Sequence, residues 1–153
     1  MLAVRATVAL VFPITVDGLV PWALVRGDAT FHGVMALVGV PLVVVGTVLL
    51  ADSVFLRFAR EGRGTLAPID PPRFVVRGGA YRFTRNPMYV ANLAILAGIA
   101  ITFRSLAVAG WAGFMALTFH LFVISYEEPK LRDTFGESYE VYRREVPRWL
   151  PSH

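Results

Sequence analysis

Long apolar runs alternate with polar segments along this chain. The runs cover residues 3–24, 33–56, 87–103 and 106–126. Each is close to the roughly 20 residues that a helix needs to cross the hydrocarbon core of a bilayer. The first run exceeds the apolar core of about 7–15 residues in a secretory signal, and Pro21 and Trp22 replace the small residues of a cleavage site. The pattern predicts an all-α integral membrane bundle of about four transmembrane helices, forming a single domain over residues 1–153.

Two polar segments flank the later apolar runs. Segment 57–86 is rich in Gly and Pro, which predicts a loop with a short extended piece at Arg73-Phe74-Val75-Val76. A loop of this length in a small protein is usually functional. Segment 127–153 carries apolar residues at spacings of three and four, namely Leu131, Phe135, Tyr139, Tyr142 and Val146. This spacing predicts a C-terminal amphipathic helix at the membrane interface.

Composition narrows the class of protein. Hydrophobic residues make up 56% of the chain and charged residues only 17%, which indicates that lipid surrounds much of it. The net charge of +4 comes from arginines gathered between apolar runs, so it favours anionic headgroups over nucleic acid. There is no Cys, and His32, His120 and His153 are widely separated. We therefore expect no metal site and no nucleic-acid partner.

The arginines also orient the bundle. Segment 57–86 carries seven arginines against Glu61 and Asp70, whereas the connection near 25–32 has only Arg26 and Asp28. Positively charged loops stay on the cytoplasmic side. We therefore expect a multi-pass protein with segment 57–86 and both termini in the cytoplasm, and with tight turns on the outside.

Arg85-Asn86-Pro87 stands where the third run begins. Asn is a strong N-cap residue, and Pro is favoured at the first helical position. The first turn of such a helix attracts anions, and Arg85 would add a planar donor for a carboxylate or phosphate. A purely capping and lipid-contacting role is an equally open interpretation.

Glu127-Glu128 stands at the cytoplasmic end of the fourth run. Carboxylates are disfavoured at a helix C-terminus, so two of them there call for a cationic or hydrogen-bond-donating partner. Pro129 predicts that the helix breaks after Glu128. Pairing with Arg132 or with loop arginines is one outcome, and binding of a donor-rich ligand is the other.

Three further ionisable residues lie within the apolar runs. They are Asp17, Asp52 and His120. Ionisable groups in lipid are costly and are often functional. Asp17 lies between two prolines, Asp52 is near the end of its run, and His120 precedes Glu127 by seven residues, on the same helix face. His120 and Glu127 are the two candidate catalytic groups.

An ordered series of motifs resembles a known family. It consists of Gly79-Ala80-Tyr81, Arg85-Asn86-Pro87-Met88-Tyr89, Glu127-Glu128, Phe135-Gly136-Glu137-Ser138-Tyr139 and Val146-Pro147-Arg148-Trp149. It is similar to the isoprenylcysteine carboxyl methyltransferase and phospholipid methyltransferase superfamily of integral membrane enzymes. The resemblance covers about half of the chain, from Arg73 to Pro151.

The resemblance implies a methyl donor, S-adenosyl-L-methionine, bound on the cytoplasmic side. The positions it implies for donor binding are Arg73, Phe74, Val75, Val76, Tyr81, Arg85, Asn86, Pro87, Met88, Tyr89, Glu127 and Glu128. The acceptor would be a lipophilic small molecule or lipid, either a prenylcysteine-like carboxylate, a phospholipid amine or another nucleophile. Asn86 and the Tyr126-to-Pro129 stretch favour the phospholipid branch, whereas the Val146-Pro147-Arg148 tail favours the carboxyl branch.

Two other functions fit part of the pattern. A nicotinamide-dependent membrane reductase of related fold would use Arg82 and Arg85 for phosphates, although the paired acids would then face a polyanion. A non-enzymatic membrane assembly protein would need the polar segments only as caps, which leaves the ordered motifs unexplained.

Overall fold

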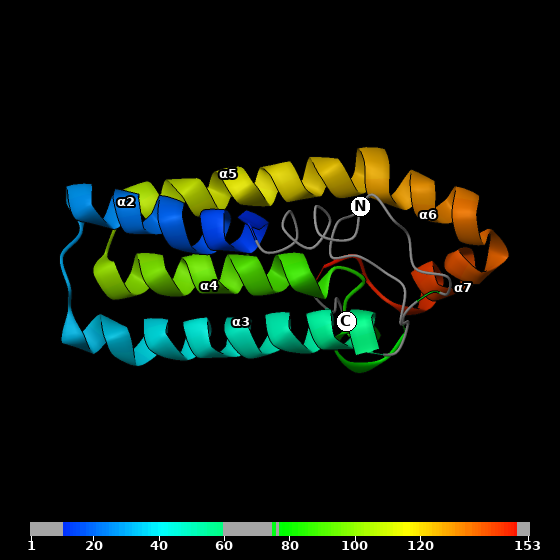
Figure 1. Ribbon diagram of the computed structural model, residues 1–153, viewed down its shortest axis with the longest axis horizontal. Helices are drawn as coiled ribbons and strands as arrows, with labels where there is room; N and C mark the ends of the chain where they lie inside the picture. Colours follow the sequence, from blue (N-terminus) through cyan, green and yellow to red (C-terminus); the bar gives the residue numbers. More distant parts are fainter. Residues whose placement is uncertain (1–10, 60–74, 76, 150–153) are drawn as a thin grey trace.

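The computed structural model is a bundle of helices (Figure 1). It describes residues 11–59, 75 and 77–149. The elements are η1 Ile14–Leu19, α2 Val20–Asp28, α3 Gly33–Ala59, η2 Gly79–Arg82, α4 Pro87–Phe103, α5 Leu106–Phe122, η3 Val123–Glu127, α6 Glu128–Phe135 and α7 Glu137–Glu145. No strand occurs among these residues, so the all-α class is confirmed. Of the expected extended piece, Arg73, Phe74 and Val76 lie outside the described residues.

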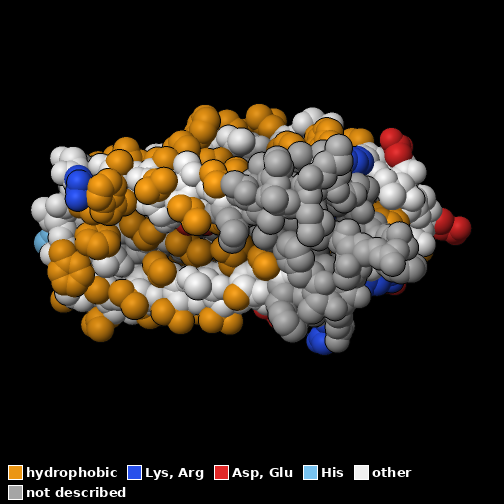
Figure 2. Space-filling view, viewed as in Figure 1, with side chains coloured by type: hydrophobic (Ala, Val, Ile, Leu, Met, Phe, Trp, Pro, Cys, Tyr) orange, Lys and Arg blue, Asp and Glu red, His pale blue; other side chains and the backbone are white. Residues whose placement is uncertain are grey.

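The apolar runs all contain helix, but fewer than four qualify as membrane spans. Within the described ranges, Gly33–Val54 and Leu106–Phe135 are long and apolar enough to cross a bilayer, and Pro87–Phe103 is apolar but shorter. Both long segments expose apolar side chains, such as Leu37 at 75% and Phe114 at 58%. Figure 2 shows this hydrophobic surface over the helices, with Lys, Arg, Asp and Glu towards the two ends of the molecule. This surface suits contact with lipid.

Close backbone contact joins α3 to α4. Gly39 and Gly46 of α3 meet Gly98, Ala91 and Ile95 of α4. A Cβ atom at Gly98 would lie 2.5 Å from the Gly39 carbonyl oxygen, nearer than real contacts allow. Small residues let helices approach this closely, and van der Waals packing then holds them together without a hydrophobic driving force. α4 is thereby fixed between α3 on one side and α2 and α5 on the other.

Prolines set the shape of two helices. Pro21 follows the π-helical turn η1, and Pro129 follows the π-helical turn η3. At the end of η1, the Val20 N–H donates to the Thr15 carbonyl, five residues earlier. At the end of η3, the Glu128 N–H donates in the same way to the Val123 carbonyl. A proline ring collides with the carbonyl four residues earlier in a regular α-helix. The wider turn removes that collision. The break expected after Glu128 is therefore wrong, because the chain stays helical into α6.

The tail forms two short helices where one was expected. Gly136 separates α6 from α7 with φ 52° and ψ −126°, a conformation that ends a helix. The apolar residues of the expected helix still lie together. Tyr139, Tyr142 and Val146 are buried, and Val75, Leu131 and Phe135 pack against them.

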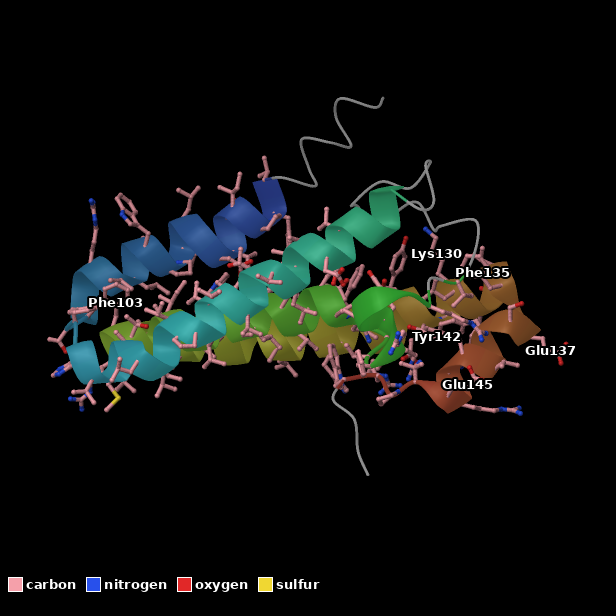
Figure 3. The ribbon with its side chains drawn as sticks, turned by 90° about the horizontal axis from the view of Figure 1, so that it is seen from below. Phe103, Lys130, Phe135, Glu137, Tyr142 and Glu145 are labelled. Atoms are coloured by element: carbon pink, nitrogen blue, oxygen red, sulfur yellow. The ribbon has the colours of Figure 1, made fainter. Side chains whose placement is uncertain are left out.

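The connections gather at two opposite ends. At one end, the Thr30 and His32 N–H groups donate to the carbonyls of Phe103 and Thr102, which joins the 29–32 connection to the turn at Arg104. At the other end lie η2, the start of α4 and the helices α6 and α7 (Figure 3). Nitrogen and oxygen atoms are dense around Tyr142 and Glu145 in that view.

Candidate functional site

The two polar motifs meet in space. Tyr89, in the first turn of α4, donates its hydroxyl hydrogen to Glu127 Oε2 at 3.0 Å. Arg85 Nη1 donates to Glu128 Oε1, also at 3.0 Å. The structure therefore brings the two motifs together, because each motif contributes one partner to each contact.

Glu128 belongs to a buried ion cluster. Its side chain is 5% exposed and that of Arg85 is 8% exposed. Arg148 binds Glu128 in a bidentate manner. Its Nε donates to Oε1 at 2.7 Å, and its Nη2 donates to Oε2 at 3.0 Å. The hydrogen bond to Glu128 raises the pKa of Arg148, so the pair remains ionised. Glu128 thus holds Arg85 and the C-terminal segment in place.

Tyr139 completes this cluster. Arg85 Nη1 also donates to the Tyr139 hydroxyl oxygen at 3.2 Å. Burial, followed by the charge of Glu128, raises the pKa of Tyr139, so its hydroxyl stays protonated. Beside it, burial raises the pKa of Tyr142, whose hydroxyl donates to the Tyr81 carbonyl at 2.7 Å. Tyr81, expected at the donor site, therefore anchors α7 through its backbone.

Glu127 has different surroundings. It is half-buried, and its partner Tyr89 stacks on Phe119 with ring centroids 4.7 Å apart. Trp149 lies 6.5 Å from Tyr89, and its Nε1 donates to His120 Nδ1 at 3.3 Å. His120 is therefore linked to the site through Trp149. An aromatic wall beside an acidic group suits a flat ring or a cation.

One donor in the site lacks a partner. Arg85 Nε is buried and makes no hydrogen bond to any residue that the structure describes, although the neighbouring Nη1 makes two. An unsatisfied buried donor is unfavourable and calls for an explanation. An anionic group of a ligand, such as a carboxylate, fits this position. Among the described residues, the anion that Arg85 contacts is Glu128, and a ligand anion at Arg85 stays a prediction.

A C-terminal strap, Val146–Trp149, crosses the start of α4. The Arg85 N–H donates to the Pro147 carbonyl at 2.9 Å, and the Thr84 hydroxyl donates to the Arg148 carbonyl at 3.0 Å. Asn86 occupies the N-cap position as expected, but its side chain donates to the Arg148 carbonyl at 2.9 Å and caps no N–H group of α4. The expected side-chain capping role of Asn86 is thus wrong, because the strap competes for that side chain.

The remaining predicted positions have mixed surroundings. Pro87 is buried at the first position of α4, and Met88 is half-buried beside it. Val75 packs in the tail cluster. Asp52 accepts a hydrogen bond from the Ala80 N–H at 3.2 Å and so positions η2. Asp17 lies away from these contacts, in η1.

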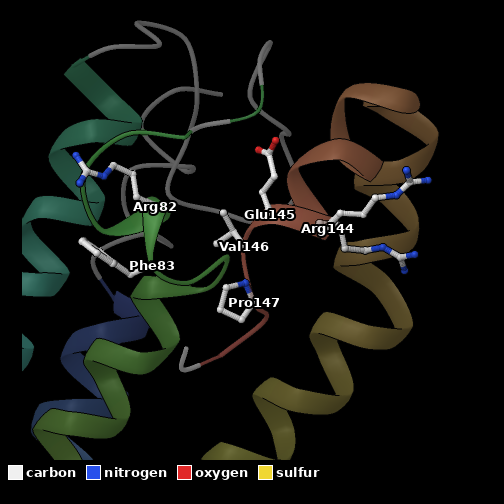
Figure 4. A pocket seen from close by; sticks show the side chains of 7 residues that line it. Arg82, Phe83, Arg144, Glu145, Val146 and Pro147 are labelled. Carbon is white, nitrogen blue, oxygen red and sulfur yellow. The ribbon is translucent and has the colours of Figure 1, made fainter. Parts of the chain in front are cut away.

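A separate hollow of about 470 Å³ lies between the end of η2, the end of α7 and the first residues of the strap (Figure 4). Its lining residues are Arg82, Phe83, Arg143, Arg144, Glu145, Val146 and Pro147. Arg82 and Arg144 extend to opposite sides in that view. Tyr89, Glu127 and Glu128 do not line this hollow. We therefore place the candidate site at the Tyr89–Glu127 contact, where the polar and aromatic groups converge.

Arg148, Tyr139 and Trp149 were missed as site residues by sequence reasoning. The signal for Arg148 was present, because two adjacent acids at a helix end require more than one cation. Nothing in the spacing pairs Trp149 with His120, since 28 residues and the ends of α5, η3, α6 and α7 separate them. Within the described part of the chain, no group of three or more His, Asp or Glu residues could hold a metal ion.

Comparison with known proteins adds one finding. A family model described as phospholipid methyltransferase matches residues 34–138, which is more than half of the chain. The matched region contains Arg85, Tyr89 and both acids, and it ends before the strap. No curated protein and no solved structure matches the chain.

Proposed function

The chain belongs to the phospholipid methyltransferase family, and from that premise we propose that it transfers the methyl group of S-adenosylmethionine to a lipophilic acceptor at the cytoplasmic face of a membrane. Family membership makes it a membrane methyltransferase in general. The observation that carries the finer proposal is the convergence of Tyr89, Glu127 and Arg85 at one end of the bundle.

The chemistry of these residues fits the methyl donor. The unpartnered Arg85 Nε would bind the donor carboxylate, and Glu127 would accept from its amino group or ribose hydroxyls. Tyr89 and Trp149 would offer ring faces to the cationic or flat parts. Glu128 acts indirectly, by holding Arg85 and Arg148. The other positions proposed for the donor are Arg73 to Val76, Tyr81 and Asn86 to Met88.

Methyl transfer asks the protein mainly for alignment. When bound, S-adenosylmethionine supplies an electrophilic methyl group on a positively charged sulfur. Displacement in line requires the acceptor atom close to that methyl group, which proximity alone can accelerate greatly. A carboxylate acceptor would need no base, whereas an amine must lose a proton. Glu127 is the proposed proton acceptor, and His120 is the second candidate.

The membrane arrangement proposed with this function has four spans. The two shorter helical regions, η1 with α2 and α4, would cross beside α3 and α5, with the loop 57–86 and both termini in the cytoplasm. The strap with α6 and α7 would lie at the interface as an amphipathic cover. The arginines carried by η2, α6, α7 and the strap, all at the site end, support this orientation.

Product analysis tests the reaction directly. The purified protein in lipid nanodiscs would be incubated with S-adenosylmethionine carrying a labelled methyl group and with a lipid extract. Mass spectrometry should find a lipid product that carries the label, and Glu127→Ala and Tyr89→Phe should reduce its rate at least about tenfold. Glu137→Ala, an exposed acid outside the site, is the control. Absence of labelled lipid would reject the proposal. So would site variants that both form the product at the wild-type rate.

A further inference from the structure

A buried carboxylate in η1 has no partner. Both oxygens of Asp17 are inaccessible, and neither makes a hydrogen bond within the described residues. The surrounding helix is apolar, and an ionisable group in such a place is costly and commonly functional. The residue also lies inside a π-helical turn, a feature that is frequent at functional sites.

A second unpartnered acceptor lies on the neighbouring helix α4. Asn92 is 3% exposed, and its Oδ1 is buried without a hydrogen-bond partner in the described part of the chain. Asn92 follows Tyr89 by three residues and precedes Leu96 by four, so the three share one face of α4. Two independent acceptors, on two helices in contact, thus lack a donor.

The elements that carry the two groups, η1 and α4, meet at one apolar cluster. Val16, next to Asp17, is buried with Leu96, Met115 and Phe119, and Tyr89 packs against this cluster. Trp111 Nε1 donates to the Val16 carbonyl at 3.1 Å, which fixes η1 against α5. Asp17 and Asn92 therefore belong to two elements that pack together at this cluster, and Tyr89 of the candidate site packs against the same cluster. Asn92 is about 4.5 Å further along α4 than Tyr89.

We propose that Asp17 and Asn92 form an intramembrane subsite that binds the hydrogen-bond-donating hydroxyl or amine of a lipophilic ligand. The acceptor oxygens of both residues lack a donor among the described residues, and a ligand that carries only acceptor groups cannot supply one. This proposal rests on the proposed function, because it takes the ligand to be the methyl acceptor. A second polar group of that acceptor would lie one helical turn deeper than Tyr89.

Without ligand, Asp17 should lower the stability of the folded protein. If Asp17 had a structural partner, its removal would destabilise the protein. An unsatisfied buried acceptor is instead unfavourable in the absence of ligand, and an apolar residue of similar size removes that penalty. Asp17→Leu should therefore raise the unfolding temperature without ligand and abolish the preference for donor ligands.

The test uses two probes of nearly equal length, 1-dodecanol and dodecyl methyl ether. Only the alcohol donates a hydrogen bond. Tryptophan fluorescence would follow thermal unfolding of the full chain in nanodiscs, because ligand binding to the folded state raises the unfolding temperature. The wild type should bind the alcohol at least about tenfold more tightly than the ether. Asp17→Leu and Asn92→Leu should bind both equally, while Thr118→Val, an exposed intramembrane hydroxyl, should keep the wild-type preference.

Three outcomes would overturn the proposal. They are equal binding of the two probes by the wild type, an undiminished preference in both variants, and a lower unfolding temperature or loss of folding in Asp17→Leu. Calorimetric binding of S-adenosylmethionine to the same samples separates this proposal from the previous one. If the wild type does not bind S-adenosylmethionine, the proposed function is rejected. The preference for 1-dodecanol over the ether then still tests the subsite.

Discussion

Glu127 and Glu128 are adjacent in sequence but lie in different surroundings. Glu128 is buried and accepts three hydrogen bonds from Arg85 and Arg148, whereas Glu127 is half-buried and its Oε2 accepts from the Tyr89 hydroxyl. In the π-helical turn that ends at Glu127, successive side chains point in different directions. We therefore propose separate roles for the two acids, with Glu128 holding the site together and Glu127 facing the ligand.

This difference predicts opposite results for the two amides. Glu128→Gln removes the charge that balances two arginines, and leaving Arg85 buried without a counterion should lower the free energy of unfolding by about 3 kcal/mol. Glu127→Gln should change it by less than about 1 kcal/mol. Denaturant titration in detergent micelles would measure both, with the exposed Glu137→Gln as control. Equal losses for the two variants would contradict the assignment of roles.

At the scale of the element, the contact between α3 and α4 depends on glycine. Gly98→Ala places a methyl group against the Gly39 backbone, so the helices must separate. Overpacking of this kind should destabilise the protein by about 2 kcal/mol. Gly110→Ala in α5, where a Cβ atom meets nothing within 4 Å, should be neutral or slightly stabilising. Thermal unfolding in micelles would compare the two, and an equal effect would refute the close packing.

The joint between α6 and α7 also requires glycine. Gly136 has φ 52° and ψ −126°, which side chains with a Cβ atom rarely adopt, although no neighbouring atom would obstruct one. Gly136→Ala should therefore destabilise the tail by about 1–3 kcal/mol through backbone strain alone. Hydrogen exchange at Tyr139 and Tyr142 would report the loss locally, with Gly113→Ala as the matched control. Unchanged protection at both tyrosines would show that the joint tolerates another conformation.

Sequence reasoning succeeded where local chemistry decides the structure. Pro87 at the first helical position and the turn after Phe103 gave α4 the same bounds as the third apolar run. It failed at Pro129, where a break in the helix was expected. The helix instead widens to a π-helical turn before the proline and continues, which the presence of a proline alone does not indicate. It also failed at Asn86, whose side chain is taken by a strap 62 residues further along the chain. Such contacts depend on the tertiary fold and produce no periodic pattern of hydrophobic residues in the sequence.

At the scale of the whole molecule, an apolar middle separates two polar ends. The Thr30 connection and the Arg104 turn lie at one end, and the candidate site lies at the other. The natural chain has no Cys, so a single introduced thiol can be labelled without background. Thr30→Cys and Glu137→Cys replace exposed residues at the two ends.

The proposed orientation predicts opposite labelling of these two thiols. In intact cells, a membrane-impermeant maleimide should modify Thr30→Cys and leave Glu137→Cys unmodified. After permeabilisation both should react, which controls for thiol reactivity. Modification of both in intact cells, or of Glu137→Cys alone, would contradict the placement of the site in the cytoplasm.

Calorimetric titration of the protein in nanodiscs with S-adenosylmethionine tests the central claim most directly. The account predicts that the wild type binds, that Glu127→Ala and Tyr89→Ala reduce the affinity at least about tenfold, and that Glu137→Ala binds like the wild type. A parallel titration with NADPH should show no binding. The account would be contradicted by a wild type that fails to bind S-adenosylmethionine, or by unchanged affinity in both site variants.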